Sequence, residues 1–192
     1  MERNTPTEAK RSPGFGFFKW IFDYVEVLAI SVLAVLLVFT FCFRICRVDG
    51  NSMNNTLLND ERLITSNLFY TPKQGDIIVC QSVKYGLDKP LVKRIIATEG
   101  QKVRLDRENW KIYVNDFPLE EPYLVIGEGM MVDWQYDTDE IVIPKGHVFV
   151  MGDNRNNSLD SRFYSVGMID ERYIIGQVIY RFLPFDVFGP VK

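Results

Sequence analysis

The amino-acid sequence predicts a mostly β domain of antiparallel sheets that is preceded by one N-terminal transmembrane helix. The first observation is an apolar stretch, residues 27–43, without a charged side chain. The second is the pattern of the remaining chain, in which short runs of β-branched and aromatic residues are separated by turn residues, with no long helical periodicity. About eight such runs over one domain's length indicate packed antiparallel sheets.

The composition excludes several classes of function. The chain has 192 residues with 22 Lys+Arg against 25 Asp+Glu, so a nucleic-acid partner has no electrostatic support. The three cysteines, Cys42, Cys46 and Cys80, show no metal-ligand spacing, and their odd number argues against a disulfide framework. With a single histidine, His147, a site built from several imidazoles is excluded as well. We expect no metal and no cofactor.

The N-terminal region has the composition of a membrane anchor. Residues 1–14 are polar and are predicted to be disordered. Extended back to Ile21, the apolar stretch is long enough to cross about 30 Å of hydrocarbon. A cleavable signal peptide is the alternative. Its apolar core is usually about 7–15 residues long and is followed by a small-x-small cleavage site. Here the uncharged core is longer and is followed by Arg-Ile-Cys-Arg, which favours a retained anchor. Aromatic residues typical of a membrane interface precede the span: Phe15, Phe17, Phe18, Trp20, Phe22 and Tyr24.

The distribution of basic residues sets the expected orientation. Four basic residues precede the span and only Arg44 and Arg47 closely follow it, which favours a cytoplasmic N-terminus. We therefore expect a cytoplasmic tail over residues 1–20, an anchor over 21–43 and an extracytoplasmic domain over 44–192.

Eight segments of the outer domain have strand composition, and residues 106–139 are less regular. This region carries more Glu, Trp, Tyr and Gly, so we expect an inserted subdomain or loop region there. The predicted strands are 62–64, 76–80, 91–98, 101–105, 111–114, 140–143, 147–151 and 174–182.

Ser52 lies on a Gly/Asn-rich turn shortly after the anchor, within the sequence Val-Asp-Gly-Asn-Ser-Met-Asn-Asn-Thr-Leu of residues 48–57. Gly50 and Asn51 tolerate a positive φ, which identifies a turn. On this evidence alone Ser52 is an ordinary turn residue. Ser52 can act as a nucleophile only if the chain supplies a base. The single histidine, His147, is a poor candidate for that base, because it begins a strand after Pro-Lys-Gly, a position typical of a structural histidine.

Lys93 is the candidate base. In the predicted strand 91–98, alternation places it on one face with Leu91, Ile95 and Ala97. If that face is buried, desolvation lowers the lysine pKa and the neutral amine can act as a general base. The alternative is a lysine that extends from a strand edge to water.

A polar segment, residues 152–162, follows the apolar strand 147–151. Ser158, Asp160 and Arg162 alternate along it, so a hydroxyl could orient the amine while an ion pair fixes the loop. A solvated loop held by Asx hydrogen bonds is the alternative.

Taken together, these segments resemble type I signal peptidases, the bacterial membrane-bound Ser-Lys proteases that remove signal peptides from exported proteins. The resemblance runs from the anchor to about residue 182 and keeps the family's order. Its motifs are Gly50-Asn51-Ser52-Met53 with Thr56-Leu57, Gly75-Asp76-Ile77-Ile78-Val79, Val92-Lys93-Arg94-Ile95-Ile96, and Gly152-Asp153-Asn154-Arg155 with Ser158, Asp160, Ser161 and Arg162.

The resemblance implies a role for each matching residue. Ser52 is the nucleophile, Lys93 the general base, and Ser158 the serine that hydrogen-bonds the lysine amine. Asp160 and Arg162 form a structural ion pair, and Gly152 and Asn154 shape the loop. Candidate walls of the substrate pockets, which accept alanine, are Val48, Met53, Leu57, Leu91 and Val92.

The chain departs from the family pattern near the nucleophile. Asn55 stands where the family usually has proline, which predicts a less rigid turn after Ser52. After Arg162 the sequence Phe-Tyr-Ser-Val-Gly displaces the family's glycine. Gly50 stands where some members carry a serine oxyanion donor, so backbone N–H groups, including that of Ser52, would form the oxyanion hole.

The resemblance implies a membrane-bound serine endopeptidase acting on signal peptides, with membrane lipid and the protein-export translocon as further partners. One alternative is a self-cleaving Ser-Lys repressor-type domain, which the anchor and the lack of a basic patch disfavour. Another is a catalytically impaired, membrane-tethered binding protein that retains the fold; Ser52, Lys93 and Ser158 together argue against it.

Overall fold

The structure, a computed structural model, describes residues 13–82, 89–106, 108–109, 111–124 and 134–191. The chain divides into two compact units, Met1–Phe41 and Cys42–Lys192. We describe each unit by itself.

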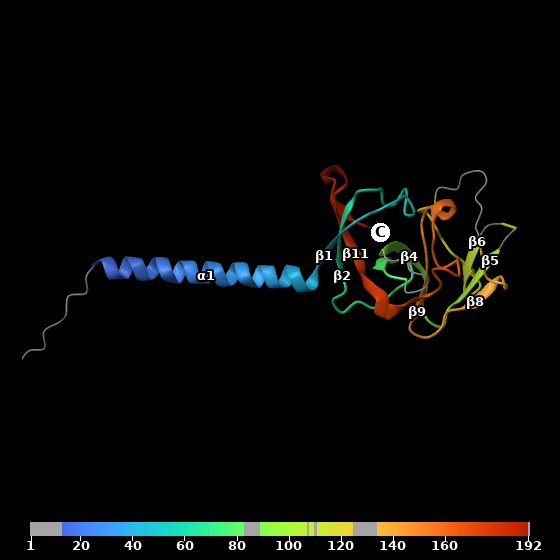
Figure 1. Ribbon diagram of the computed structural model, residues 1–192, viewed down its shortest axis with the longest axis horizontal. Coiled ribbons are helices and arrows are strands. Elements are labelled where there is room, and N and C mark those ends of the chain that lie inside the picture. Colours follow the sequence, from blue (N-terminus) through green and yellow to red (C-terminus); the bar gives the residue numbers. More distant parts are fainter. Residues whose placement is uncertain (1–12, 83–88, 107, 110, 125–133, 192) are drawn as a thin grey trace, which may run out of the picture. The chain divides into compact units, whose positions relative to one another are not determined.

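The described residues of the first unit belong to the long helix α1, Pro13–Cys42 (Figure 1). Proline is favoured in the first turn of a helix because its missing N–H has no intrahelical partner there. Pro13 and Gly14 belong to the helix and not to the polar tail predicted for residues 1–14; residues 1–12 lie outside the described residues. Within α1, Phe18–Cys42 is long and apolar enough to cross a membrane, with a mean hydropathy of 2.6.

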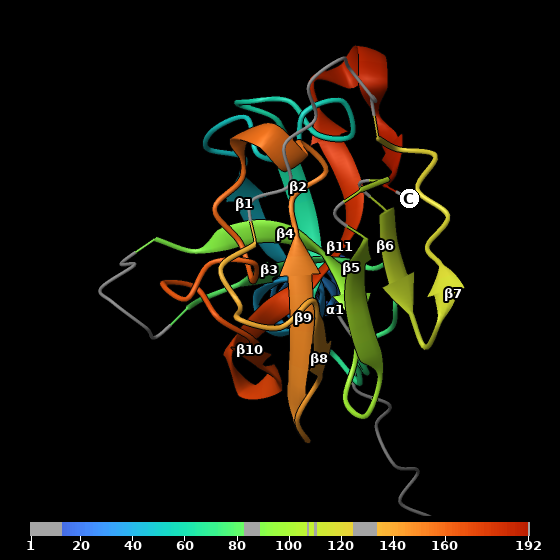
Figure 2. The same ribbon diagram turned by 90° about the vertical axis from the view of Figure 1, so that its right-hand side faces the viewer.

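The second unit contains antiparallel strands in two sheets. The larger sheet has the order β1-β2-β11-β3-β4-β9-β10, with β12 paired to β11, and the smaller has the order β7-β6-β5-β8. In Figure 1, β4 and β9 lie between the strands β1, β2 and β11 and the smaller sheet, and Figure 2 shows β5, β6 and β7 side by side. The mostly β, antiparallel fold class is confirmed.

All eight predicted strands are present, with ends shifted by up to two residues. They are β2 (Arg62–Ser66), β3 (Ile77–Cys80), β4 (Leu91–Ala97), β5 (Lys102–Asp106), β6 (Lys111–Val114), β8 (Glu140–Val142), β9 (His147–Met151) and β11 (Ile174–Leu183).

Four short strands were not predicted: β1 (Arg44–Arg47), β7 (Phe117–Pro118), β10 (Ile169–Asp170) and β12 (Gly189–Pro190). Three 3₁₀ helices complete the described elements: η1 (Arg155–Asn157), η2 (Glu171–Tyr173) and η3 (Phe185–Val187). Residues 111–118, within the region predicted as irregular, form the β6–β7 hairpin of the smaller sheet.

Strand β4 is central to both the core and the site. It pairs with β3 on one side and with β9 on the other, and residues from Lys93 to Ala97 are all buried. A bulge between Ile95 and Ala97 interrupts the predicted alternation. Ala97 therefore packs with Ile96 in the hydrophobic cluster that joins β4 and β9 to the smaller sheet, and not on the face of Ile95.

Candidate active site

Ser52 lies on a turn between β1 and β2 that the backbone closes at its base. Val48 N donates to Glu61 O at 2.9 Å and Asp60 N donates to Val48 O at 3.0 Å, which extends the pairing of the two strands. Two residues after Val48, Gly50 adopts a φ of +104°, which glycine accepts without strain. The turn thus projects Ser52 from the end of a hairpin, half-buried.

Asn55 takes a backbone conformation that proline cannot adopt. Its φ is 74°, in the left-handed region where asparagine is among the enriched residues. Proline is restricted to a φ near −65°. Two bonds from the following residues to Met53 O, Thr56 N at 3.0 Å and Leu57 N at 2.8 Å, enclose Asn55 in a closed turn. The turn therefore has a backbone geometry that a proline at position 55 could not adopt.

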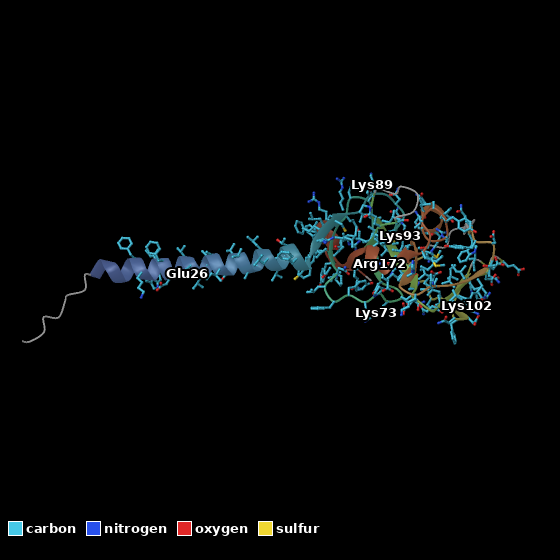
Figure 3. The ribbon with its side chains drawn as sticks, turned by 60° about the horizontal axis from the view of Figure 1, so that its bottom comes forward. Glu26, Lys73, Lys89, Lys93, Lys102 and Arg172 are labelled. Atoms are coloured by element: carbon cyan, nitrogen blue, oxygen red, sulfur yellow. The ribbon has the colours of Figure 1, made fainter. Side chains whose placement is uncertain are left out.

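Lys93 brings its amine to this turn from strand β4. Its Nζ lies 2.6 Å from Ser52 Oγ, and the side chain is only 2% exposed. Figure 3 shows Lys93 inside the β unit, whereas Lys73 and Lys89 lie at its periphery. Burial lowers the pKa of Lys93 below its ordinary value of 10.5, and the nearby Asp160 carboxylate acts in the opposite direction. The net lowering increases the fraction of neutral amine, which is the form that accepts a proton.

Strand pairing brings the 152–162 loop to the same place. Arg94 on β4 is the partner of Met151 on β9, so the chain leaves β9 beside Lys93. Asn154 then ties the loop to the serine turn: its N–H donates to Ser52 O at 3.0 Å and its Nδ2 donates to Asn51 O at 3.0 Å. His147 begins β9 at the other end of that strand.

Gly152 occupies a position without room for a side chain. A Cβ atom there would collide with the carbonyl oxygen of Ser52 and with the Oγ of Ser158. Its N–H donates to Asp160 Oδ2 at 3.0 Å. Glycine therefore leaves space in which both the Ser52 carbonyl and the Ser158 hydroxyl lie close to the loop backbone.

Asp160 and Arg162 form a fully buried, two-bond ion pair, with Nε to Oδ1 at 2.7 Å and the second nitrogen to Oδ2 at 2.8 Å. The Ser158 hydroxyl donates to Asp160 Oδ2 at 2.6 Å. This bond orients the Ser158 oxygen; hydrogen bonding of Ser158 to the lysine amine stays a prediction.

A second buried ion pair, between Arg94 and Asp153, lies near Ser52 and Lys93, and the sequence pattern does not indicate its role. Arg94 donates to both carboxylate oxygens of Asp153, at 2.9 and 2.7 Å, and the Thr56 hydroxyl donates to Asp153 Oδ2 at 2.5 Å. Arg181 on β11 donates to Thr56 O at 3.2 Å and also pairs with the buried Glu61. A charged residue inside an otherwise apolar strand is the signal that could have found Arg94 and Arg181.

The five proposed pocket walls differ in how much surface they offer. Val48, Met53 and Leu57 lie in one hydrophobic cluster and are at most 3% exposed. Leu91 and Val92 at the start of β4 are half-buried. Substrate contact by any of them stays a prediction, and the surface available is at Leu91 and Val92.

Comparison with known proteins gives one consistent result. Residues 21–183 match the model of the family described as signal peptidase, peptidase S26. The chain is 35% identical to signal peptidase I T of Bacillus subtilis (strain 168), over 100% of this chain and 98% of that protein. It is 33% identical to a probable signal peptidase I-1 of Synechocystis, over 90% of this chain and 87% of that protein.

Among solved structures, the chain is similar to the crystal structure of a signal peptidase I from Enterococcus faecalis V583. The TM-score is 0.46 and the identity is 27%, over 56% of this chain and 97% of that chain.

Proposed function

The chain belongs to the signal peptidase I family of peptidase S26 and is a serine endopeptidase that removes signal peptides, and we propose that Ser52 and Lys93 are its catalytic dyad. The observation that carries the proposal is the 2.6 Å distance between Lys93 Nζ and Ser52 Oγ. The lysine that makes this contact is buried. A hydroxyl within hydrogen-bond reach of a neutral amine can transfer its proton as it attacks.

The first half of the reaction acylates the serine. Neutral Lys93 accepts the Ser52 proton while Oγ attacks the carbonyl carbon of the scissile peptide bond. Backbone N–H groups, including that of Ser52, stabilise the resulting oxyanion. Lys93 then gives its proton to the leaving amine, which departs as the new N-terminus of the mature protein.

The second half regenerates the enzyme. Lys93, neutral again, takes a proton from water, and the hydroxide attacks the acyl carbon. The tetrahedral intermediate collapses, the Ser52 oxygen recovers the proton from Lys93, and the signal peptide leaves with a free carboxylate. Every proton transfer uses the same amine, which is why its pKa must be lowered.

Strand β4 offers the signal peptide an edge along which it can extend. Within the described residues, β3 pairs with Leu91–Arg94 whereas β9 pairs with β4 only from Arg94 onward. The side of Leu91–Lys93 away from β3 is therefore available for β-strand addition by an extended peptide. This pairing would bring the scissile bond to Ser52 with Leu91 and Val92 beside it.

The anchor and the signal peptide meet at one membrane. One N-terminal apolar helix is consistent with the membrane-bound state of the family. We further propose that the N-terminus is cytoplasmic, that the β unit lies on the outer face, and that lipid and the translocon are its partners. Protease protection in inverted vesicles tests the orientation, since the β unit would then be shielded.

Cleavage of a full-length preprotein in detergent tests the dyad. Ser52→Ala and Lys93→Ala should each lower kcat by at least about a thousandfold, as loss of a nucleophile or base does in serine proteases. Lys145→Ala, at an exposed lysine, is the matched control and should cleave normally. Retained cleavage by either dyad variant would overturn the assignment.

A penem acylating probe distinguishes a working enzyme from an impaired binding protein with the same fold. The unmodified chain should form a covalent acyl adduct at Ser52, and the Ser52→Ala protein should not. An unmodified chain that fails to label would support the binding-protein alternative.

A further inference from the structure

Residues 119–124 lie in the region that the sequence left without a role, and two of their side chains contact the residues that support the dyad. Leu124 N donates to Glu121 O at 3.1 Å, which closes a tight turn. Within the turn, the Tyr123 hydroxyl donates to Glu121 Oε1 at 3.1 Å. We call Glu121, Pro122 and Tyr123 the 121–123 clasp.

Glu121 holds Arg155 of the 152–162 loop. Both terminal nitrogens of Arg155 donate to the Glu121 carboxylate, one of them to Oε2 at 3.1 Å. The side chains are 2% and 10% exposed, so the ion pair is screened from water. A bidentate, buried pair of this kind fixes the guanidinium plane as well as its position.

Arg155 transmits this position to Gly152. Its Nε donates to Gly152 O at 3.1 Å. Gly152 is the residue that lies against both the Ser52 carbonyl and the Ser158 hydroxyl. A displacement of the Arg155 guanidinium would therefore move the backbone that touches the nucleophile turn.

Tyr123 covers the second arginine of the site. The guanidinium carbon of Arg94 lies 3.9 Å from the centre of the Tyr123 ring. Arg94 binds Asp153, the neighbour of Gly152, and follows Lys93 in β4. The clasp thus contacts two guanidinium groups that hold two consecutive residues of the loop, Gly152 and Asp153.

We propose that the 121–123 clasp positions the nucleophile turn and the 152–162 loop for catalysis, with Glu121 and Tyr123 as positioning residues that do not touch substrate. The proposal rests on Ser52 and Lys93 as the dyad. Because the clasp acts on the geometry of the reacting groups, its loss should lower kcat and leave KM for the preprotein nearly unchanged.

Kinetics of the full-length chain in detergent test the clasp, with kcat calculated per active site titrated by the penem probe. Glu121→Gln should lower kcat by about tenfold to a hundredfold, with KM within about twofold. Glu120→Gln makes the same chemical change at the adjacent exposed carboxylate and should leave kcat unchanged. A lower melting temperature with an unchanged kcat per titrated site would overturn the proposal.

Tyr123→Phe keeps the test decisive if Glu121→Gln does not fold, and a double variant sharpens it if Glu121→Gln does fold. Tyr123→Phe removes the hydroxyl that binds Glu121 and keeps the ring over Arg94, so a fall in kcat of about twofold to fivefold is expected. Arg155→Met combined with Glu121→Gln should be no slower than Arg155→Met alone, because Glu121 acts through Arg155. An unaffected Tyr123→Phe enzyme, or independent effects of the two changes, would overturn the clasp.

Ser52→Ala in the same assay separates the two proposals. If it still cleaves, the dyad is wrong and the clasp falls with it. If it is inactive while Glu121→Gln matches the unmodified chain, only the clasp is wrong.

Discussion

Lys93 is buried in a strand whose other residues are mostly apolar, and this placement is costly for the fold and useful for the reaction. A buried ammonium loses its hydration, so burial lowers the pKa of Lys93 below its ordinary value. Asp160 opposes this effect, since its carboxylate favours the ammonium. The result is an amine whose pKa is lowered by burial and which the strand holds 2.6 Å from Ser52 Oγ, as the proposed base requires.

Replacing Lys93 by methionine should separate these two consequences. Lys93→Met should be inactive, with kcat lower by at least about a thousandfold, yet more stable than the unmodified protein at neutral pH. The folded-state pKa lies below 10.5, so the penalty is complete below that lowered pKa and is relieved as pH rises towards 10.5. The stability difference between the two proteins should therefore shrink as pH rises.

Urea unfolding of the two proteins at several pH values measures this difference. Lys145→Met, at an exposed lysine, is the control and should show no such trend. A stability difference independent of pH would mean that the Lys93 amine is not protonated differently in the folded and unfolded states.

Asn55 gives a second residue-scale prediction, because the substitution that matches the family pattern should be harmful here. Asn55→Pro forces a φ near −65° where the structure has 74°, so we expect it to destabilise the protein by more than about 1 kcal/mol. It should also slow acylation of Ser52 by the penem probe. Asn55→Gly accepts the positive φ and should acylate at the normal rate.

Thermal melting and stopped-flow acylation measure both effects. Faster acylation by Asn55→Pro would show that the proline turn is accessible to this sequence and that Asn55 is not required for the turn geometry seen here.

At the scale of elements, the 152–162 loop depends on the absence of one side chain. Gly152→Ala would place a methyl group against the Ser52 carbonyl and the Ser158 hydroxyl, and backbone cannot yield as a flexible side chain can. We expect kcat to fall by about a hundredfold, the effect of moving reacting groups by about 1 Å. The same substitution at Gly189, where an added Cβ meets nothing within 4 Å, is the control.

Kinetics per titrated active site and thermal melting distinguish a displaced loop from a misfolded one. A Gly152→Ala enzyme with normal kcat would mean that the loop shifts without moving Ser52.

The strands that the sequence predicts are those with their own hydrophobic pattern. The strand β1, Arg-Ile-Cys-Arg, carries a charge at each end, and its register with β2 pairs Arg47 with Arg62 across the hairpin that bears Ser52. Two-residue strands such as β7 and β10 arise from pairing with a neighbour and not from composition. Such elements exist because of tertiary contacts, which a local pattern does not contain.

The residues of the candidate site also fall into those that local patterns predict and those that only tertiary contacts bring together. Ser52, Lys93 and the loop follow from turn chemistry, strand alternation and the family motifs. Alternation assumes one buried face, but β4 lies between β3 and β9 and is buried on both faces, so the burial of Arg94 was not predicted. The pairs Arg94–Asp153 and Arg155–Glu121 join residues 59 and 34 positions apart, a separation that no local pattern spans.

At the scale of the whole molecule, the proposed dyad depends on three segments far apart in the chain. The β1–β2 turn supplies Ser52, β4 supplies Lys93, and the end of β9 leads into Gly152. Pairing of β4 with β9 fixes the last two relative to each other, and Asn154 ties the first to the third. Since each of these contacts lies within residues 42–192, the proposed catalytic arrangement is held together by contacts of the β unit.

A chain that begins at Cys42 should therefore fold and cleave. The three hydrophobic clusters of the β unit are formed by residues from Cys46 onward, so the shortened chain retains all of them. We expect an unchanged melting temperature and a kcat within about twofold for a short soluble peptide substrate. Binding to lipid vesicles should fall steeply, because burial of a long apolar helix in hydrocarbon is lost. Vesicle flotation and peptide kinetics on the two proteins measure these outcomes, with Ser52→Ala in the shortened chain as the inactive control. A shortened chain that melts at a lower temperature would show that the helix contributes to the stability of the β unit.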